Sequence, residues 1–185
     1  MPDSIDRTTL PAAFLPLAKA QSIIEHDRDD ALVTEHLAQA IDDVERLTNA
    51  CIFERETEME GDQLGDPVLA WATPTARNWL ALPFNNVSAL VVTDAMGVDV
   101  SAAYRIKQRD LGGVGTAWLQ GPDVAPLAPT LFAFTAGMAT IDEIAPALRR
   151  LILRRAAALY EFREAALPLT ADDLAREPAL WRPDL

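Results

Sequence analysis

The segment from 144 to 163 constrains the fold more strongly than any other part of the sequence, because its apolar residues recur at helical spacing. These residues are Leu148, Leu151, Ile152, Leu159 and Phe162. Pro146 suits the first turn, where its missing N–H is not needed, and the acidic pair before it would lie at the positive end of the helix dipole. A helix of roughly twenty residues measures about 30 Å, so the rest of the chain must supply a surface on which it can pack.

Length and cysteine content indicate one domain from a reducing compartment. A chain of 185 residues can bury enough surface to fold without a disulfide or metal staple. Its single cysteine, Cys51, excludes an intramolecular disulfide. The sequence has no apolar run of about eighteen residues, and its start lacks the basic and apolar regions of a signal peptide. We therefore expect a chain that is made in the cytoplasm and does not cross a membrane.

The net charge limits the ways in which this chain can meet nucleic acid. At −12, the charge argues against a protein that grips DNA through its phosphates, which requires a basic face. An acidic surface instead repels phosphate within a Debye length of about 8 Å. The composition therefore remains compatible with a protein that lets DNA pass without binding it.

Two helices are expected in the first 50 residues. Residues 1–14 show no periodic pattern and are expected to form a loose arm. A short helix is expected over Pro16–Ile24, followed by an aspartate-rich turn at 26–30 that can cap the next helix. That next helix is predicted over Asp30–Thr48, because its apolar residues form one stripe. The stripe consists of Val33, Leu37, Ala40, Ile41, Val44 and Leu47.

Between residues 51 and 138 the pattern changes to short apolar runs separated by turn signals. Residues 51–58 alternate with a period of two, which is typical of an exposed strand. The later runs lie at 68–72, 79–82, 87–93, 98–108, 116–119 and 130–135. The sequence thus predicts a β module of about five or six strands between two helical segments.

Because the expected helices and strands are segregated, the predicted fold class is α+β rather than α/β. Its helical core, at 15–50 and 142–166, has two helices near the N-terminus and one long C-terminal helix. An antiparallel β module over 51–138 is inserted between them, and 167–185 form an extended C-terminal tail. The whole chain, 1–185, is expected to be a single domain.

No catalytic, cofactor-binding or metal-binding constellation stands out in the sequence. The two histidines, His26 and His36, follow no ligand pattern and are expected to be solvent-exposed. Cys51 has no basic neighbour in sequence that would activate it, so a small buried apolar residue is the better interpretation. The glycines at 112–115 do not open a helix and no Lys-Ser/Thr follows them, which favours a hairpin turn over a phosphate cradle. The sequence therefore predicts no enzyme, no cofactor and no metal.

Two charged groups are candidate interaction surfaces. Four glutamates, at 54, 56, 58 and 60, are spaced to lie on one face of a strand. That face would be solvated, or it would form a wall toward DNA or a neighbouring subunit. The arginines of the long helix would pair within the helix, bind phosphate or contact a neighbouring subunit. The intersubunit candidates are Arg149, Arg150, Arg154 and Arg155.

The C-terminal tail resembles neither a core segment nor a plain linker. Thr170–Asp173 fit the start of a short helical turn, while Pro178 and Pro183 exclude a long helix. Apolar residues in such a segment often become ordered on a partner, with an aromatic residue and an arginine as anchors. Folding back onto its own domain is the alternative. The candidate partner contacts are Leu174, Leu180, Trp181, Arg182 and Leu185.

Three segments, in order, carry a resemblance to a known family. The first runs over 17–26 and through the helix that ends Glu45-Arg-Leu-Thr-Asn49. The second is Leu82-Pro-Phe-Asn-Asn-Val-Ser-Ala-Leu-Val-Val92. The third joins Phe134-Thr-Ala-Gly137 and Ile144-Ala-Pro146 to the helix that ends Tyr160-Glu-Phe-Arg-Glu164. Together these segments resemble the head–tail connector, or adaptor, proteins of long-tailed bacteriophages and gene transfer agents.

The resemblance implies a structural virion protein of the head–tail interface, made in the bacterial cytoplasm. About a dozen copies would form a cyclic ring beneath the portal protein, extend the DNA channel, and present a platform for a stopper or tail protein. The helices would build the ring, and the tail would reach the portal. Double-stranded DNA would pass through the lumen without sequence-specific binding, in agreement with the acidic balance. The β module, 51–138, is longer than in the mainly helical members.

Two alternatives remain open. A stopper or tail-terminator protein would share the β module but should not need two long flanking helices. A soluble acidic binding module, from a different class, would need a ligand pocket with converging polar groups. The sequence offers no evident residues for such a pocket.

Overall fold

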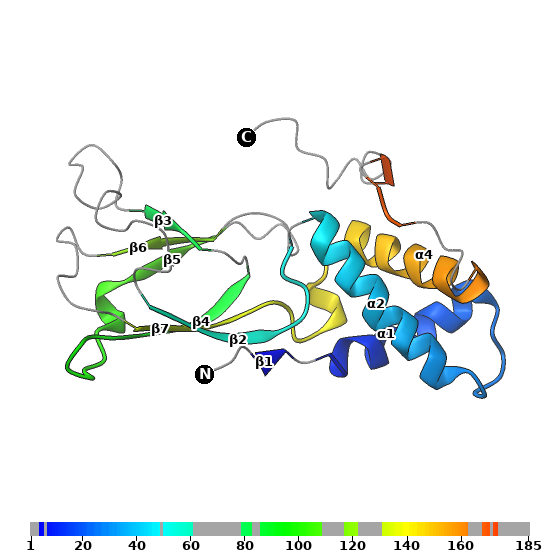
Figure 1. Cartoon of the computed structure of the whole chain (residues 1–185), viewed down its shortest axis with the longest axis horizontal. Helices are drawn as coiled ribbons and strands as arrows, with labels where there is room; N and C mark the ends of the chain where they lie inside the picture. Colours follow the sequence, from blue (N-terminus) through cyan, green and yellow to red (C-terminus); the bar gives the residue numbers. More distant parts are fainter. Residues whose placement is uncertain are drawn as a thin grey trace. The chain divides into compact units, whose positions relative to one another are not determined.

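The structure, a computed structural model, describes residues 4–5, 7–48, 50–60, 79–82, 86–108, 117–121, 131–162, 168–170 and 172–173. These residues form two compact units (Figure 1). The β unit holds residues 4–5 and the described part of 54–137, and the helical unit holds the described parts of 7–53 and 138–173. Helices and antiparallel sheets are segregated, so the predicted α+β class is confirmed. The expectation that 1–185 act as one domain stays a prediction.

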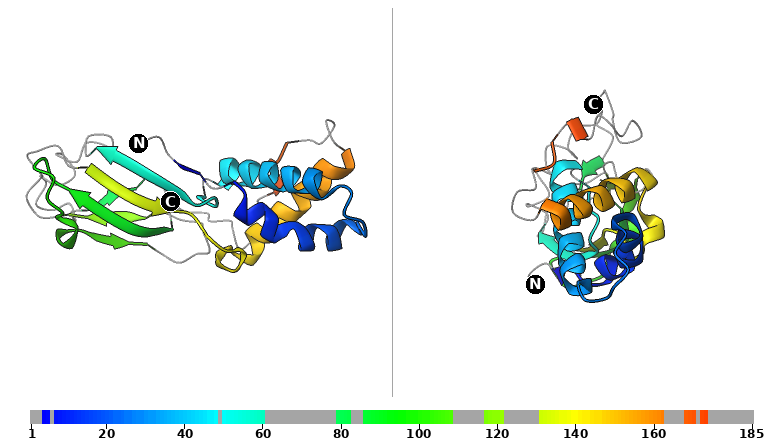
Figure 2. Two further views of the ribbon diagram at one scale, coloured as in Figure 1. Left: turned by 90° about the horizontal axis from the view of Figure 1, so that it is seen from below. Right: turned by 90° about the vertical axis from the view of Figure 1, so that its right-hand side faces the viewer.

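Three helices pack side by side in the helical unit (Figures 1 and 2). They are α1 (Thr9–Ser22), α2 (Asp30–Thr48) and α4 (Pro146–Phe162). The bounds of α2 are those predicted, and α4 lies inside the predicted segment 144–163, because most residues of the apolar stripes face the core. An exception is Phe162 in the last turn of α4, which was expected in the stripe but is 59% exposed. Burying each large side chain contributes roughly 1.5–3 kcal/mol. The fully buried large side chains of the three helices are Phe14, Leu37, Ile41, Leu148, Leu151 and Ile152.

The first helix begins earlier than the sequence pattern suggested. The expectation of a loose arm is wrong for residues 4–5, which pair with Glu56 and Arg55 as a short strand. It is also wrong for residues 9–14, because α1 starts at Thr9 and continues through Pro16. Leu10, Phe14 and Ala18 are four residues apart and buried against the unit. This burial outweighs the loss of one helical hydrogen bond at Pro16. The sequence pattern alone instead indicates Pro16 as the start of the helix.

The segment after α2 also differs from the expected alternation. Cys51, Ile52 and Phe53 are all buried, with exposed fractions of 3%, 0% and 0%, so no exposed strand begins there. The Met138 N–H donates to the Ile52 carbonyl at 3.0 Å, and Phe53 forms a parallel bridge with Met138. The strand prediction from the alternating pattern fails here because the segment lies inside the helical unit. The expectation of a small buried Cys51 is confirmed.

The end of α1 contains a strained residue. Ile23 has φ 53° and ψ 44°, in the left-handed region, and its side chain is 82% exposed. A β-branched residue is disfavoured in this conformation, because its Cβ crowds the following carbonyl. Ile23 therefore stores strain that no packing of its side chain offsets.

We expect Ile23→Gly to raise the free energy of unfolding by about 1 kcal/mol, because glycine adopts this conformation without the Cβ clash. Ile23→Ala is the matched control, since it removes the exposed side chain but keeps the Cβ. Urea unfolding of both variants would check the prediction. Equal stabilisation by alanine and glycine would contradict it.

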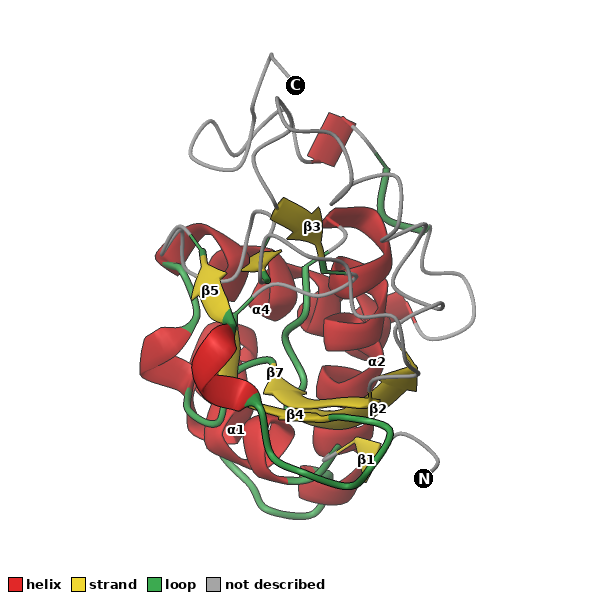
Figure 3. Ribbon diagram, turned by 90° about the vertical axis from the view of Figure 1, so that its left-hand side faces the viewer, coloured by secondary structure: helices red, strands yellow, loops and turns green. Residues whose placement is uncertain are grey.

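Two antiparallel sheets form the β unit as separate layers (Figures 1 and 3). The first has the order β1-β2-β7-β4 and the second has the order β3-β6-β5. Their strands are β1 (Ser4–Ile5), β2 (Arg55–Glu60), β3 (Trp79–Ala81), β4 (Val87–Thr93), β5 (Arg105–Lys107), β6 (Trp118–Gln120) and β7 (Leu131–Ala136). The expected antiparallel β module is thus present, while the predicted run at 68–72 lies outside the described residues.

The core of the β unit lies between the two layers. On β7, Phe132 and Phe134 are buried while their sequence neighbours are more exposed, as a period of two requires. Leu119 of β6 is fully buried. Tyr104, just before β5, meets Phe132 edge to face with ring centroids 5.5 Å apart. Burial raises the pKa of Tyr104.

Side chains close the outer edge of β4. The Gln108 amide both accepts from the Val87 N–H at 2.8 Å and donates to the Val87 carbonyl at 2.9 Å. Farther along the strand, the Val92 N–H donates to Ser101 Oγ, and its carbonyl accepts from the Val100 N–H. The bonds at Val87 and Val92 occupy backbone groups of this edge and so disfavour its pairing with another strand.

Candidate functional site

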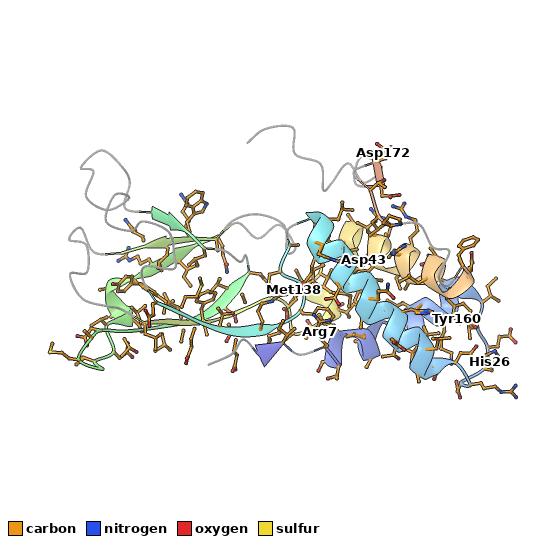
Figure 4. The ribbon with its side chains drawn as sticks, viewed as in Figure 1. Arg7, His26, Asp43, Met138, Tyr160 and Asp172 are labelled. Atoms are coloured by element: carbon orange, nitrogen blue, oxygen red, sulfur yellow. The ribbon has the colours of Figure 1, made fainter. Side chains whose placement is uncertain are left out.

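A buried ion pair joins α2 to α4. Nε and Nη2 of Arg155 lie 2.8 Å and 2.7 Å from the same Asp43 oxygen, Oδ2. Arg46 donates to the other oxygen, Oδ1. The side chains of Arg155 and Asp43 are only 7% and 12% exposed (Figure 4 labels Asp43). Arg155 therefore compensates a buried carboxylate inside the helical unit.

The other three candidate arginines are more accessible than Arg155. The Arg149 side chain is 30% exposed and lies 3.8 Å from Asp142, while Arg154 is 43% exposed and lies 3.9 Å from Asp173. Arg150 is exposed. The intersubunit role expected for the four arginines stays a prediction, and exposure favours Arg150 and Arg154 over Arg155.

The histidines carry no described chemistry. His26 is exposed, as expected. His36 is half-buried rather than exposed, because its ring packs edge to face on Tyr160 of α4, with centroids 6.4 Å apart. The hydroxyl of Tyr160, which Figure 4 labels, in turn donates to Asp29 at 2.8 Å. These contacts support the packing of α4 on the start of α2.

An ion cluster fixes the turn between α1 and α2. The Lys19 ammonium lies 2.6 Å from Asp27 Oδ1 and 2.7 Å from Asp30 Oδ1. The hydrogen bond to Asp27, followed by that to Asp30, raises the pKa of Lys19, and the bond from Lys19 lowers the pKa of Asp27. Because the acidic turn already has this cation, its role is structural.

The described part of the C-terminal tail, residues 168–170 and 172–173, forms a capped turn. The Thr170 N–H and hydroxyl both donate to Asp173 Oδ2, at 2.9 Å and 3.0 Å, which confirms the expected capped turn. The candidate partner contacts of the tail, from Leu174 to Leu185, all lie outside the described residues. Their role stays a prediction.

An acidic face covers the outer side of the first sheet. Glu56, Glu58 and Glu60 of β2 are exposed and alternate with the inward-facing residues of that strand. Their partners on β7 are Thr135, Ala133 and Leu131, which pair onward with Ala89, Val91 and Thr93 of β4. Val91 is 48% exposed and Leu131 is 38% exposed. We call this surface the acidic face: three glutamates beside an exposed apolar strip.

A basic face that sequence reasoning missed covers the outer side of the second sheet. Arg105 and Lys107 of β5 are exposed on either side of the half-buried Ile106. Lys107 pairs directly with Trp118 of β6, which is 42% exposed. The alternation Arg-Ile-Lys was the available signal, but it spans only three residues. We call the surface formed by Arg105, Lys107 and Trp118 the basic face.

The part of the chain that the structure describes holds neither a candidate metal cluster nor a membrane-spanning helix. Its His, Cys, Asp and Glu side chains form no group of three or more that could hold a metal ion. None of its helices is both long enough and apolar enough to cross a membrane.

The comparisons with known proteins rest on structure alone. No protein-family model and no curated protein matches the sequence. The chain is similar to one in the neck of an empty gene transfer agent particle, computed with C6 symmetry, with a TM-score of 0.68, 17% identity, and coverage of 100% of this chain and 97% of that chain. It is also similar to one in the virion of a native gene transfer agent particle, with a TM-score of 0.60, 19% identity, and coverage of 96% and 95%. At these identities the likeness establishes a shared fold along nearly the whole chain.

Proposed function

We propose that this chain is a structural, non-enzymatic protein of the virion, located in the neck of a gene transfer agent particle. The observation that carries the proposal is the similarity of fold, over 100% of this chain, to a chain in such a neck. There, copies of the chain would form a ring that joins the capsid portal to the tail or to the next head-completion protein. The net charge of −12 supports a channel through which double-stranded DNA slides without binding.

The proposed ring is compatible with the symmetry of the similar particle. That neck was computed with C6 symmetry, and a ring with twelvefold symmetry contains a sixfold axis. In such a ring each copy contacts its two neighbours through two different surfaces. The exposed Arg150 and Arg154 of α4, with Arg149, are proposed contributors to these contacts.

Helix lengths support an adaptor over a stopper or tail-terminator. The latter class should not need long helices on both sides of its β module. In this chain α2 has 19 residues and α4 has 17, and they flank strands β2 to β7 in sequence. The helical unit that they build is therefore consistent with the ring-forming part of an adaptor.

The tail, 167–185, is the proposed contact with the portal protein. We expect truncation after Leu167 to leave the chain folded but to prevent its incorporation into particles. Among the described contacts, the truncation removes the part-exposed Arg154–Asp173 pair, worth less than about 1 kcal/mol. Thermal unfolding would measure the stability, and quantitative mass spectrometry of purified particles would measure the copies per portal. Trp181→Ala in the full chain tests the proposed aromatic anchor separately.

The number of copies of this chain per portal in purified particles tests the proposed function. Near-constant copies per portal across preparations, in a number that fits a cyclic ring, would support the adaptor proposal. Absence of the full-length chain from purified particles would overturn it. If the truncated chain were still incorporated, the ring proposal would stand and the portal contact would have to lie elsewhere. If the truncated chain failed to fold, the tail would be part of the core.

A further inference from the structure

The two outer faces of the β unit carry opposite charge. The acidic face presents Glu56, Glu58 and Glu60, while the basic face presents Arg105 and Lys107. The two faces belong to different sheets, which form separate layers with the Tyr104–Phe132 contact between them (Figures 1 and 3). The two faces therefore point away from one another, and a single chain cannot bring them together. Two copies of the chain can bring the acidic face of one against the basic face of the other.

The two faces also match in composition. On the acidic face, Glu60 pairs directly with the exposed Leu131. Glu58 and the exposed Val91 pair with the same residue of β7, Ala133, from its two sides. On the basic face, Lys107 pairs directly with the exposed Trp118. Adjacent strands are about 4.8 Å apart, so each face holds charges and apolar side chains within about 10 Å of each other. Aromatic and aliphatic residues beside charges are typical of protein–protein interfaces.

We propose that the acidic face of one copy binds the basic face of the next copy around the ring. This contact rests on the proposed ring, and it adds a contact between β units to those proposed for α4. Surfaces that differ and lie on opposite sides of one unit form head-to-tail contacts, which close into a ring when the rotation between copies allows it. Charge complementarity sets the order of the copies, because turning one copy round would bring like charges together.

Charge reversal on each face tests the proposal in cells that make the particles and lack their own copy of this chain. One variant carries Glu56→Lys with Glu58→Lys, and the other carries Arg105→Glu with Lys107→Glu. Each variant alone has two faces of the same sign. Because like charges across an interface suppress association, we expect copies per particle to fall about tenfold or more for either variant. Glu25→Lys with Glu35→Lys, on exposed sites of the helical unit, is the control for the net-charge change of the glutamate-to-lysine variant and should be incorporated normally.

Co-expression of the two charge-reversed variants is the most specific test of the proposed contact. One variant then offers two basic faces and the other two acidic faces, so alternating copies can close a ring with an even number of members. Restored incorporation of both variants, in equal amounts, would support the proposal, because a folding defect in either chain could not be rescued in this way. Matching unfolding midpoints of the separate variants would exclude misfolding. Where a reversed chain does not fold, the glutamine variants of the same residues replace it and should lower incorporation less steeply.

The outcomes separate this inference from the proposed function. Incorporation of either reversed variant at the level of the unaltered chain would overturn the contact between the two faces and leave the ring proposal intact. Failure of the co-expressed pair to recover would also overturn it, because the charges would then act on something other than each other. Absence of the unaltered chain from particles would overturn the proposed function itself, together with this inference.

Discussion

Replacing Asp43 with alanine is expected to lower the free energy of unfolding by about 3–5 kcal/mol, because it removes the carboxylate that accepts two hydrogen bonds from the buried Arg155 guanidinium. Arg155 is 6% exposed, and two of its nitrogens lie within 2.8 Å of Asp43 Oδ2. The pair joins α2 to α4, so its loss should also loosen the packing of these helices. Urea unfolding followed by circular dichroism would measure the change.

Two further variants distinguish the buried charge from a general effect on the helix. Asp43→Ala with Arg155→Met removes both charges and should recover most of the stability, because an apolar pair can replace a buried ion pair. Asp42→Ala is the matched single control, since its pair with Arg7 is 29% and 53% exposed and contributes about 0–1 kcal/mol. Equal losses for Asp42→Ala and Asp43→Ala would contradict the role assigned to Arg155.

Glu45→Ala is expected to lower the free energy of unfolding by about 2–4 kcal/mol. Glu45 Oε1 accepts from two successive backbone donors, the Ile52 N–H at 2.6 Å and the Phe53 N–H at 2.8 Å. Both donor residues are fully buried, so water cannot replace the carboxylate there. The side chain thereby holds the segment after α2 against the helical unit.

Hydrogen exchange makes this prediction specific. In Glu45→Ala the amides of Ile52 and Phe53 should exchange faster relative to the rest of the unit, while Glu45→Gln keeps an acceptor oxygen and should lose about 1 kcal/mol. Glu35→Ala, at an exposed position of the same helix, should change stability by less than about 0.5 kcal/mol. Unchanged protection of the two amides from exchange in Glu45→Ala would contradict the role assigned to the Glu45 carboxylate.

Several elements could be read from the sequence because their signals are local. The stripe from Val33 to Val44 repeats at the helical period over several turns, and α2 has the predicted bounds. The strand β4, over Val87–Thr93, also follows its predicted run. The glutamates of β2 lie on one exposed face because alternation along a strand is a property of its backbone.

Other features depended on partners that the sequence does not reveal. The start of α1 at Thr9 depends on the burial of Leu10 and Phe14, which overrides the break suggested by Pro16. Residues 51–53 read as an exposed strand until their contacts with Glu45 and Met138 placed them in a core. Local periodicity cannot show which surface a segment meets.

The candidate interaction surfaces also include features that the sequence determines and features that only the tertiary structure decides. The sequence by itself determined the acidic balance, the amphipathic helices and the row of glutamates, since these depend on composition and on spacing along one element. Only the tertiary structure decided that Arg155 is paired inside the protein, with an Asp43 that lies 112 residues earlier. Only strand register placed Lys107 beside Trp118 and Glu60 beside Leu131. Register and packing arise from contacts between distant segments, and a local pattern carries no information about which of those contacts form.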